Sequence, residues 1–165
     1  MLGRVVNAAS LSSGQSGTMR FARVEDADIK IDGLVDEAIW SEIPAFDRMT
    51  VTDPDTLEKP THSTKTRILY TDKGLYVAGE MEQPLNTLVE RLSSRDEFVN
   101  RDDFGISIDS SGDGLYGNFF NIGLGGSKQD GKIAPERNIT TQWDGPWIGE
   151  TAVTDGGWSA EMFIP

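Results

Sequence analysis

Residues Ile31–Trp40, IDGLVDEAIW, contain the strongest local structural signal in this chain. Apolar and polar side chains alternate over residues 28–32, which is the period of a half-buried strand. The Asp-Gly pair that follows is typical of a tight turn. Asp36 suits a helix N-cap, and a short helix from there to Ile43 would carry Trp40 into a core. This stretch therefore predicts a strand, a turn and one short helix.

Later segments show the same two-residue alternation, separated by Gly, Asp, Asn and Pro. Many short strands with turns between them are typical of an antiparallel β-sandwich. We therefore predict an all-β fold, an antiparallel β-sandwich with one short N-terminal helix. The predicted strands are the hairpin Thr66–Tyr70 with Leu75–Met81, the strands Phe104–Asp109 and Leu115–Leu124, and the hairpin Trp147–Thr154 with Trp158–Ile164.

The composition limits the class of partner. The 165 residues include no cysteine and carry a formal net charge of −12. A strongly acidic chain is a poor match for nucleic acid, whose phosphates reward a basic surface. The length predicts one domain, which we place at residues 21–165. Residues 1–20 lack the continuous apolar core of an intact signal peptide. Leu11–Thr18 (LSSGQSGT) is small and polar, and we expect residues 1–20 to form a flexible arm.

Four segments taken in order carry a family resemblance. They are Ile31–Trp40, Thr66–Val77 (TRILYTDKGLYV), Arg95–Asp109 (RDEFVNRDDFGISID) and Gly157–Pro165 (GWSAEMFIP). Together they resemble the family 9 carbohydrate-binding modules, especially those at the N-terminus of large bacterial outer-membrane or secreted proteins.

The resemblance covers residues 24–165. It implies a non-catalytic module that binds a glycan or polysaccharide, with structural calcium. It also implies an extracytoplasmic location, whether periplasmic, cell-surface or secreted. We expect the chain to be the front part of a longer protein, whose C-terminal region would be a second partner.

The segment Trp143–Trp147, WDGPW, is the leading candidate for a ligand site. Its Asp-Gly-Pro core is a rigid turn, and a flat aromatic ring beside polar groups suits the apolar face and polar rim of a sugar. The alternative is that both rings fill the end of the sandwich, because tryptophan is highly buried on average. Trp143 is the better ligand candidate, since Trp147 leads directly into a strand. The resemblance adds three polar candidates, which are Arg95, Asn121 and Gln142.

Two acidic segments are candidates for calcium. Asp96, Asp102 and Asp103 lie close together in sequence, and calcium takes six to eight oxygen ligands. Asp109 and Asp113 have the spacing of the first half of an EF-hand loop, although its second half is missing. The alternatives are a solvated loop with Arg–Asp pairs for the first segment and a tight turn for the second.

No convincing catalytic set is present, because one histidine and no cysteine exclude most triads and dyads. We therefore predict a protein that is not an enzyme. The main alternative to glycan binding is a structural module that docks on the rest of a longer outer-membrane or surface protein. An exposed, paired-aromatic cleft would favour binding, whereas four buried tryptophans and an apolar outer patch would favour docking.

Overall fold

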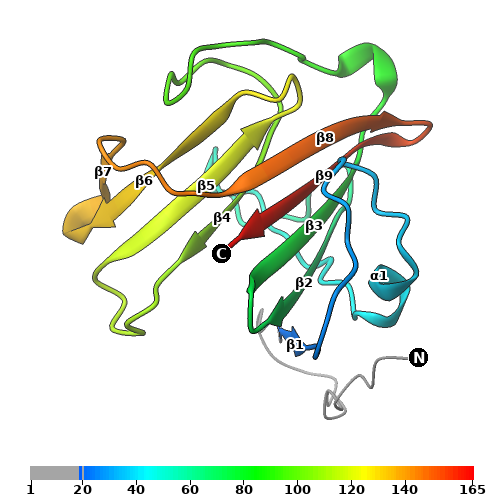
Figure 1. Cartoon of the computed structure of the whole chain (residues 1–165). Helices are drawn as coiled ribbons and strands as arrows, with labels where there is room; N and C mark the ends of the chain where they lie inside the picture. Colours follow the sequence, from blue (N-terminus) through cyan, green and yellow to red (C-terminus); the bar gives the residue numbers. More distant parts are fainter. Residues whose placement is uncertain (1–18, 20) are drawn as a thin grey trace.

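Two β-sheets pack face to face in the computed structural model, which describes Met19 and residues 21–165 (Figure 1). One sheet has the strand order β1-β2-β3-β9-β8 and the other has the order β4-β5-β6-β7. The predicted arm at residues 1–20 lies outside the described residues, except for Met19. The strands are β1 (Ala22–Arg23), β2 (Thr64–Thr71), β3 (Gly74–Glu82), β4 (Asp103–Ile108), β5 (Gly117–Gly123), β6 (Lys128–Ala134), β7 (Asn138–Thr140), β8 (Ile148–Thr154) and β9 (Gly157–Ile164).

The predicted all-β sandwich is confirmed, and both predicted hairpins form. β2 pairs with β3 and β8 pairs with β9, each antiparallel across a short turn. The short β1 runs parallel to β2, which makes the first sheet mixed. The helical elements are α1 (Ala38–Glu42) and two single turns, η1 (Leu85–Thr87) and η2 (Pro135–Arg137). No helix in the described part of the chain is both long enough and apolar enough to cross a membrane.

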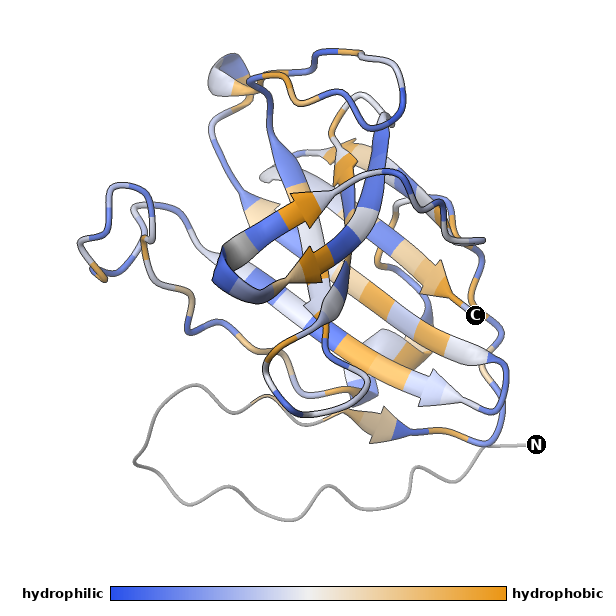
Figure 2. Cartoon of the chain, turned by 90° about the vertical axis from the view of Figure 1, so that its left-hand side faces the viewer, coloured by the Kyte–Doolittle hydropathy of each residue, from blue (hydrophilic) through white to orange (hydrophobic). Residues whose placement is uncertain are grey.

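The inner faces of the two sheets form the main core. Alternate residues of each strand point inward, so hydrophobic and hydrophilic colours alternate along the strands in Figure 2. Val77 on β3, Met162 on β9 and Ile122 on β5 are all fully buried there. Trp158 is 2% exposed in the same cluster, on the inward-facing side of β9 with Ala160 and Met162.

A second core lies on the outer face of the five-stranded sheet. The segment from Ala22 to Ile43 crosses this face and covers Leu69, Tyr76 and Ala78 (Figure 1). Trp40 is 2% exposed beneath it, which confirms its predicted burial. The centre of the five-stranded sheet is therefore covered on both faces, and the N-terminal segment forms a third layer.

Two local predictions for this covering segment are wrong. Residues 28–31 form no strand, because they lie across the face of the sheet and Ile29 and Ile31 pack downward onto it. The helix is shorter than predicted and begins at Ala38, with Glu37 rather than Asp36 as the N-cap residue. The Glu37 carboxylate accepts a hydrogen bond from the Lys30 backbone N–H at 3.0 Å instead of capping the helix.

A buried carboxylate joins this covering segment to β9. Glu161 is fully buried and accepts three hydrogen bonds. Its Oε1 accepts from Trp40 Nε1 at 2.9 Å, and its Oε2 accepts from the backbone N–H groups of Asp32 and Gly33, both at 3.2 Å. Ser159 on the same strand donates to the Gly33 carbonyl oxygen at 2.6 Å. The turn and the tryptophan of the IDGLVDEAIW segment are thus held by one side chain of the last strand.

Protonation of Glu161 should make stability depend on pH. Burial raises the pKa of Glu161 to about 7, although its three N–H donors oppose the rise. The folded state therefore favours the protonated form, so its stabilising contribution is full below about pH 4.5 and is lost as the pH rises through about 7. The expected loss of unfolding free energy over this window is on the order of 3 kcal/mol. Glu161→Gln, which does not titrate, should lack this part of the pH dependence in urea unfolding monitored at several pH values. If the unfolding free energies of the unmodified chain and of Glu161→Gln differ by the same amount from pH 5 to pH 8, this expectation is contradicted.

Gly33 should tolerate no side chain. Its φ is +88°, and a Cβ there would overlap the backbone of Thr151. Gly33→Ala should lower the free energy of unfolding by at least about 2 kcal/mol, from left-handed strain together with the clash. Gly126→Ala is the matched control, because its φ is +85° with nothing within 4 Å of the added Cβ. If thermal unfolding shows that Gly33→Ala and Gly126→Ala lose equal unfolding free energy, the clash with Thr151 contributes nothing to the loss.

Candidate functional site

The WDGPW turn lies in the segment that leads from β7 in one sheet to β8 in the other. Trp147, directly before β8, is 4% exposed and belongs to the core, whereas Trp143 is only partly buried. Phe120 on β5 meets both rings edge to face, with centroids 6.0 Å from Trp143 and 5.8 Å from Trp147. Lys128 Nζ lies 5.5 Å from the centre of the Trp147 ring. The turn is thus anchored by one tryptophan and presents the other at the surface.

A cavity of about 270 Å³ lies next to this turn. Phe120, Trp143 and Trp147 line it together with Asn118 and Ser110. The cavity walls are mostly apolar, and the polar lining residues are Asn118 on β5 and Ser110 in the turn between β4 and β5. Small-molecule sites commonly combine apolar and aromatic walls with a few polar groups. The two tryptophans of the predicted site therefore line one cavity, although the face of Trp147 is largely covered by the core.

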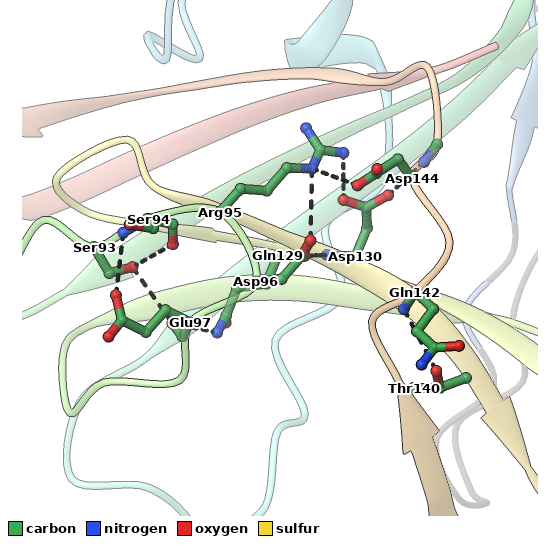
Figure 3. A network of polar contacts seen from close by, with 11 residues as sticks. Ser93, Ser94, Arg95, Asp96, Glu97, Gln129, Asp130, Thr140, Gln142 and Asp144 are labelled. Atoms are coloured by element: carbon green, nitrogen blue, oxygen red, sulfur yellow. Dashed lines mark hydrogen bonds and ion pairs between the residues drawn. The ribbon is translucent and has the colours of Figure 1, made fainter.

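Arg95 links the turn to the middle of β6 (Figure 3). Its Nη2 donates to Asp130 Oδ1 at 2.5 Å, and its Nε lies 3.0 Å from Asp144 Oδ1. The second oxygen of Asp130 accepts a hydrogen bond from the Gly145 backbone N–H at 2.5 Å. Asp130 is fully buried, so both of its oxygens are satisfied by groups that hold the turn in place.

The segment before β4 supplies Arg95 because it runs along an open sheet edge. β7 pairs only with the end of β6, from Lys132 to Ala134, so the start of β6 has no strand partner there. The Asp96 N–H donates to the Lys128 carbonyl at 3.1 Å, and Asp96 Oδ1 accepts from the Asp130 N–H at 3.0 Å. Asp96 adopts a φ of +64° to make both bonds. This segment completes the edge and brings the Arg95 guanidinium to the WDGPW turn.

Of the predicted polar ligands, Arg95 and Gln142 lie near Trp143, but Asn121 does not. Gln142 is exposed, and its backbone N–H lies 3.4 Å from Thr140 Oγ1. Asn121 follows Phe120 on β5, and adjacent strand residues point to opposite faces. Its Oδ1 lies over Gly105 on the outer face of the four-stranded sheet. Asn121 is therefore separated from the tryptophans by the sheet itself.

The five aspartates predicted as calcium ligands lie in separate hydrogen-bond networks. Asp102 Oδ2 accepts from the Val89 N–H at 2.7 Å, and Asp103 Oδ1 accepts from Arg101 Nε at 2.8 Å. Asp109 accepts from the N–H groups of its own turn, among them that of Gly114 at 2.6 Å. Asp113 Oδ1 accepts from the Leu115 N–H at 2.8 Å.

Asp96 alone of these five joins a carboxylate cluster. Among the described residues, one group of three or more candidate metal ligands occurs, in which oxygens of Asp96, Asp130 and Asp144 lie within 4.8 Å of one another. The Arg95 guanidinium contacts all three side chains, at 3.9 Å for Asp96. Arg95 therefore stands where a bound cation would stand, and an ion here would have to displace it.

Sequence reasoning missed Asp130 and the role of Asp144. Asp144 lies inside the WDGPW segment, so its position beside Trp143 was available as a signal. Asp130 offered no such signal, because a charged residue within a strand is ordinarily exposed. It is buried here because Arg95 and Gly145, from two other segments, supply its hydrogen bonds.

Comparison with solved structures identifies the fold. A family 9 carbohydrate-binding module from Caldicellulosiruptor kristjanssonii, in complex with cellotriose, matches 86% of this chain with a TM-score of 0.61 and 17% identity. The chain has the fold of the family 9 carbohydrate-binding modules. It spans 65% of that module, slightly less than two thirds of its length.

Two further structures share the fold. A family 9 module from the same organism, in complex with glucose, has a TM-score of 0.58 and 16% identity over 88% of this chain and 68% of its own. A protein from Bacteroides uniformis assigned as carbohydrate-binding has a TM-score of 0.64 and 14% identity, covering 87% of this chain and 70% of its own. No protein-family model matches the sequence, and no curated protein matches it.

Removal of the buried charge at Asp130 should loosen the turn. Asp130→Asn leaves Arg95 and the Gly145 N–H competing for one acceptor, and breaking a buried ion pair typically costs about 3–5 kcal/mol. We expect a lower thermal midpoint and a red-shifted tryptophan emission, because Trp143 becomes more solvated. The control is Asp144→Asn, whose side chain is 69% exposed and which should change stability by less than about 0.5 kcal/mol. Matching effects of the two variants would refute the assigned role of Asp130.

Proposed function

We propose that this chain is a non-catalytic glycan-binding module that holds a sugar at Trp143. The observation that carries this proposal is the partly exposed Trp143 ring, which lines a cavity of about 270 Å³ together with the Asn118 and Ser110 side chains. The Arg95–Asp144 ion pair holds the residue next to Trp143 in the same turn. Stacking on the ring would supply affinity, while the charged and amide groups at the rim would supply selectivity. The solved structures with this fold support the proposal, since two of them are described in complex with cellotriose and with glucose.

The tryptophan burial favours binding over the docking alternative. Docking would have left all four tryptophans buried, whereas only Trp40, Trp147 and Trp158 are, and Trp143 keeps an accessible face. A ring that served the core alone would gain free energy from complete burial. Its partial exposure at a mostly apolar cavity with two polar lining residues supports a role as a sugar platform.

The parent protein and the compartment also belong to this proposal. We place the module outside the cytoplasm, attached to a longer protein, on the family resemblance of the four sequence segments. Calcium at the acidic segments is retained as a proposal that the same experiment tests. Arg95 already offsets the carboxylates around Asp130, so glycan binding itself should not require the ion.

The deciding experiment is a titration with cellotriose and glucose, followed by tryptophan fluorescence and calorimetry. The unmodified chain should show a saturable signal, which Trp143→Ala should abolish. Tyr70→Ala is the matched control, because Tyr70 is an exposed aromatic on β2 (40% exposed) that lies on the other sheet and should leave binding unchanged. The titration is run in calcium and in EDTA, and a lower thermal midpoint in EDTA would support the calcium proposal.

Two results would contradict the proposed function. Absence of a saturable signal with both sugars, in a folded sample, would favour the docking module. Retention of full affinity by Trp143→Ala would show that a sugar binds elsewhere on the chain.

A further inference from the structure

A second cavity adjoins the one at Trp143. Its volume is about 590 Å³, and its lining includes Tyr116, Lys132 and Thr140. Ser110 and Asn118 line both cavities, so the two hollows meet at these residues. The pair therefore forms one continuous groove over the start of β5, with Trp143 in one part and Tyr116 in the other.

The floor of this groove is a row of side chains across the four-stranded sheet. Asn118 on β5 pairs in register with Lys132 on β6, and Lys132 pairs in turn with Thr140 on β7. Directly paired residues point to the same face, and neighbouring strands lie about 4.8 Å apart. The row thus presents an amide, an ammonium and a hydroxyl group side by side. Such spaced donors and acceptors suit the hydroxyl groups of a sugar chain.

Two of these groups are free to bind a ligand. Within residues 21–165, the Asn118 amide makes no hydrogen bond and the Lys132 ammonium makes no ion pair, although Lys132 lies in a strongly acidic chain. Other charged side chains of this sheet, such as Asp130, are fully engaged. Unengaged polar groups gathered in a hollow are a usual feature of a binding site.

The β4–β5 turn gives the groove a firm wall. Asp109 accepts hydrogen bonds from Ser111 and from the N–H groups of Gly112 and Gly114, at 2.6 to 2.9 Å. The Gly114 N–H, followed by the Ser111 hydroxyl, holds the pKa of Asp109 at about 2. Tyr116 follows this turn directly and is 60% exposed. An exposed aromatic ring on a constrained turn is suited to stacking, since little conformational entropy is lost on binding.

The groove is longer than one sugar ring. Asn118 and Phe120 share one side of β5 by their two-residue spacing, and the Phe120 ring contacts that of Trp143. Tyr116 lies just before β5 and lines the second cavity together with Asn118. Four residues of strand span about 13 Å, at a rise of about 3.4 Å per residue. A single ring at Trp143 would leave Tyr116 and Lys132 without contacts.

We propose that the module binds a neutral oligosaccharide of two or more rings along this groove, with one ring on Trp143 and a later one at Tyr116 and Lys132. This inference rests on the proposed function and specifies its substrate class. Asn118 would contact the ligand where the two cavities meet.

The test measures affinity against chain length, with glucose, cellobiose, cellotriose and cellotetraose as probes in calorimetry. The unmodified chain should bind cellotetraose about tenfold more tightly than glucose, since each further ring adds stacking and hydrogen bonds. Tyr116→Ala and Lys132→Ala should each reduce this ratio to about twofold or threefold and leave the glucose affinity unchanged. Tyr70→Ala should preserve the whole length dependence.

The outcomes separate this inference from the proposed function. Equal affinities for glucose and cellotetraose, with binding still lost in Trp143→Ala, would overturn the groove and keep the single-ring site. An unchanged length dependence in both Tyr116→Ala and Lys132→Ala, each folded by circular dichroism, would likewise overturn it. Absence of any binding would overturn the proposed function and the groove together.

Discussion

The buried carboxylate of Glu161 is the contact on which the three-layer arrangement depends. A charge inside a protein costs several kcal/mol unless donors surround it, and Glu161 has three, all from the segment between Asp32 and Trp40. These donors can reach it only when the N-terminal segment lies across the outer face of the five-stranded sheet. Apolar packing by Trp40 and Ile43 would hold that segment loosely in many positions, whereas the carboxylate selects one.

Asp130 is a second buried carboxylate that fixes a distant segment, here on the four-stranded sheet. It too is fully buried in a strand, and it accepts a backbone N–H from a distant turn, at Gly145. Glu161 holds the covering layer, whereas Asp130 and Arg95 hold the turn that presents Trp143. Both carboxylates convert a loop that would otherwise be free into a defined part of the structure. The positional accuracy of the candidate sugar platform therefore comes from buried polar contacts more than from the apolar core.

The strands and hairpins were largely predictable, because inward-facing side chains of a half-buried strand recur at every second residue. The β2–β3 and β8–β9 hairpins follow from this period together with their Asp and Gly turn residues. The strand predicted over residues 28–32 failed for a specific reason. Alternation shows that one side of a segment is buried, but it does not show that the backbone finds a partner, and this segment lies on a sheet face instead of an edge.

The candidate site was predictable only in part. The WDGPW segment could be singled out from residue type and spacing, and Arg95 from the family resemblance. The two do lie together, since Arg95 pairs with Asp144 of that segment. Asp130, Lys132 and Asn118 carried no local signal, because their meaning depends on strands that pair in register. Asn121 was selected wrongly for the same reason. Its amide could bind a sugar hydroxyl, but it lies on the outer face of β5, away from the tryptophans.

The amino-acid sequence by itself determined the β-sandwich class, the burial of Trp40 and Trp158, and the rigid turn around Trp143. Each of these depends on periodicity or on the local preferences of Asp, Gly and Pro, which act over a few residues. The tertiary structure alone decided that the carboxyl groups of Glu161 and Asp130 are buried, that Arg95 reaches the WDGPW turn, and that Tyr116 and Trp143 share a groove. Those features depend on groups far apart in the chain, which meet only after the two sheets have packed.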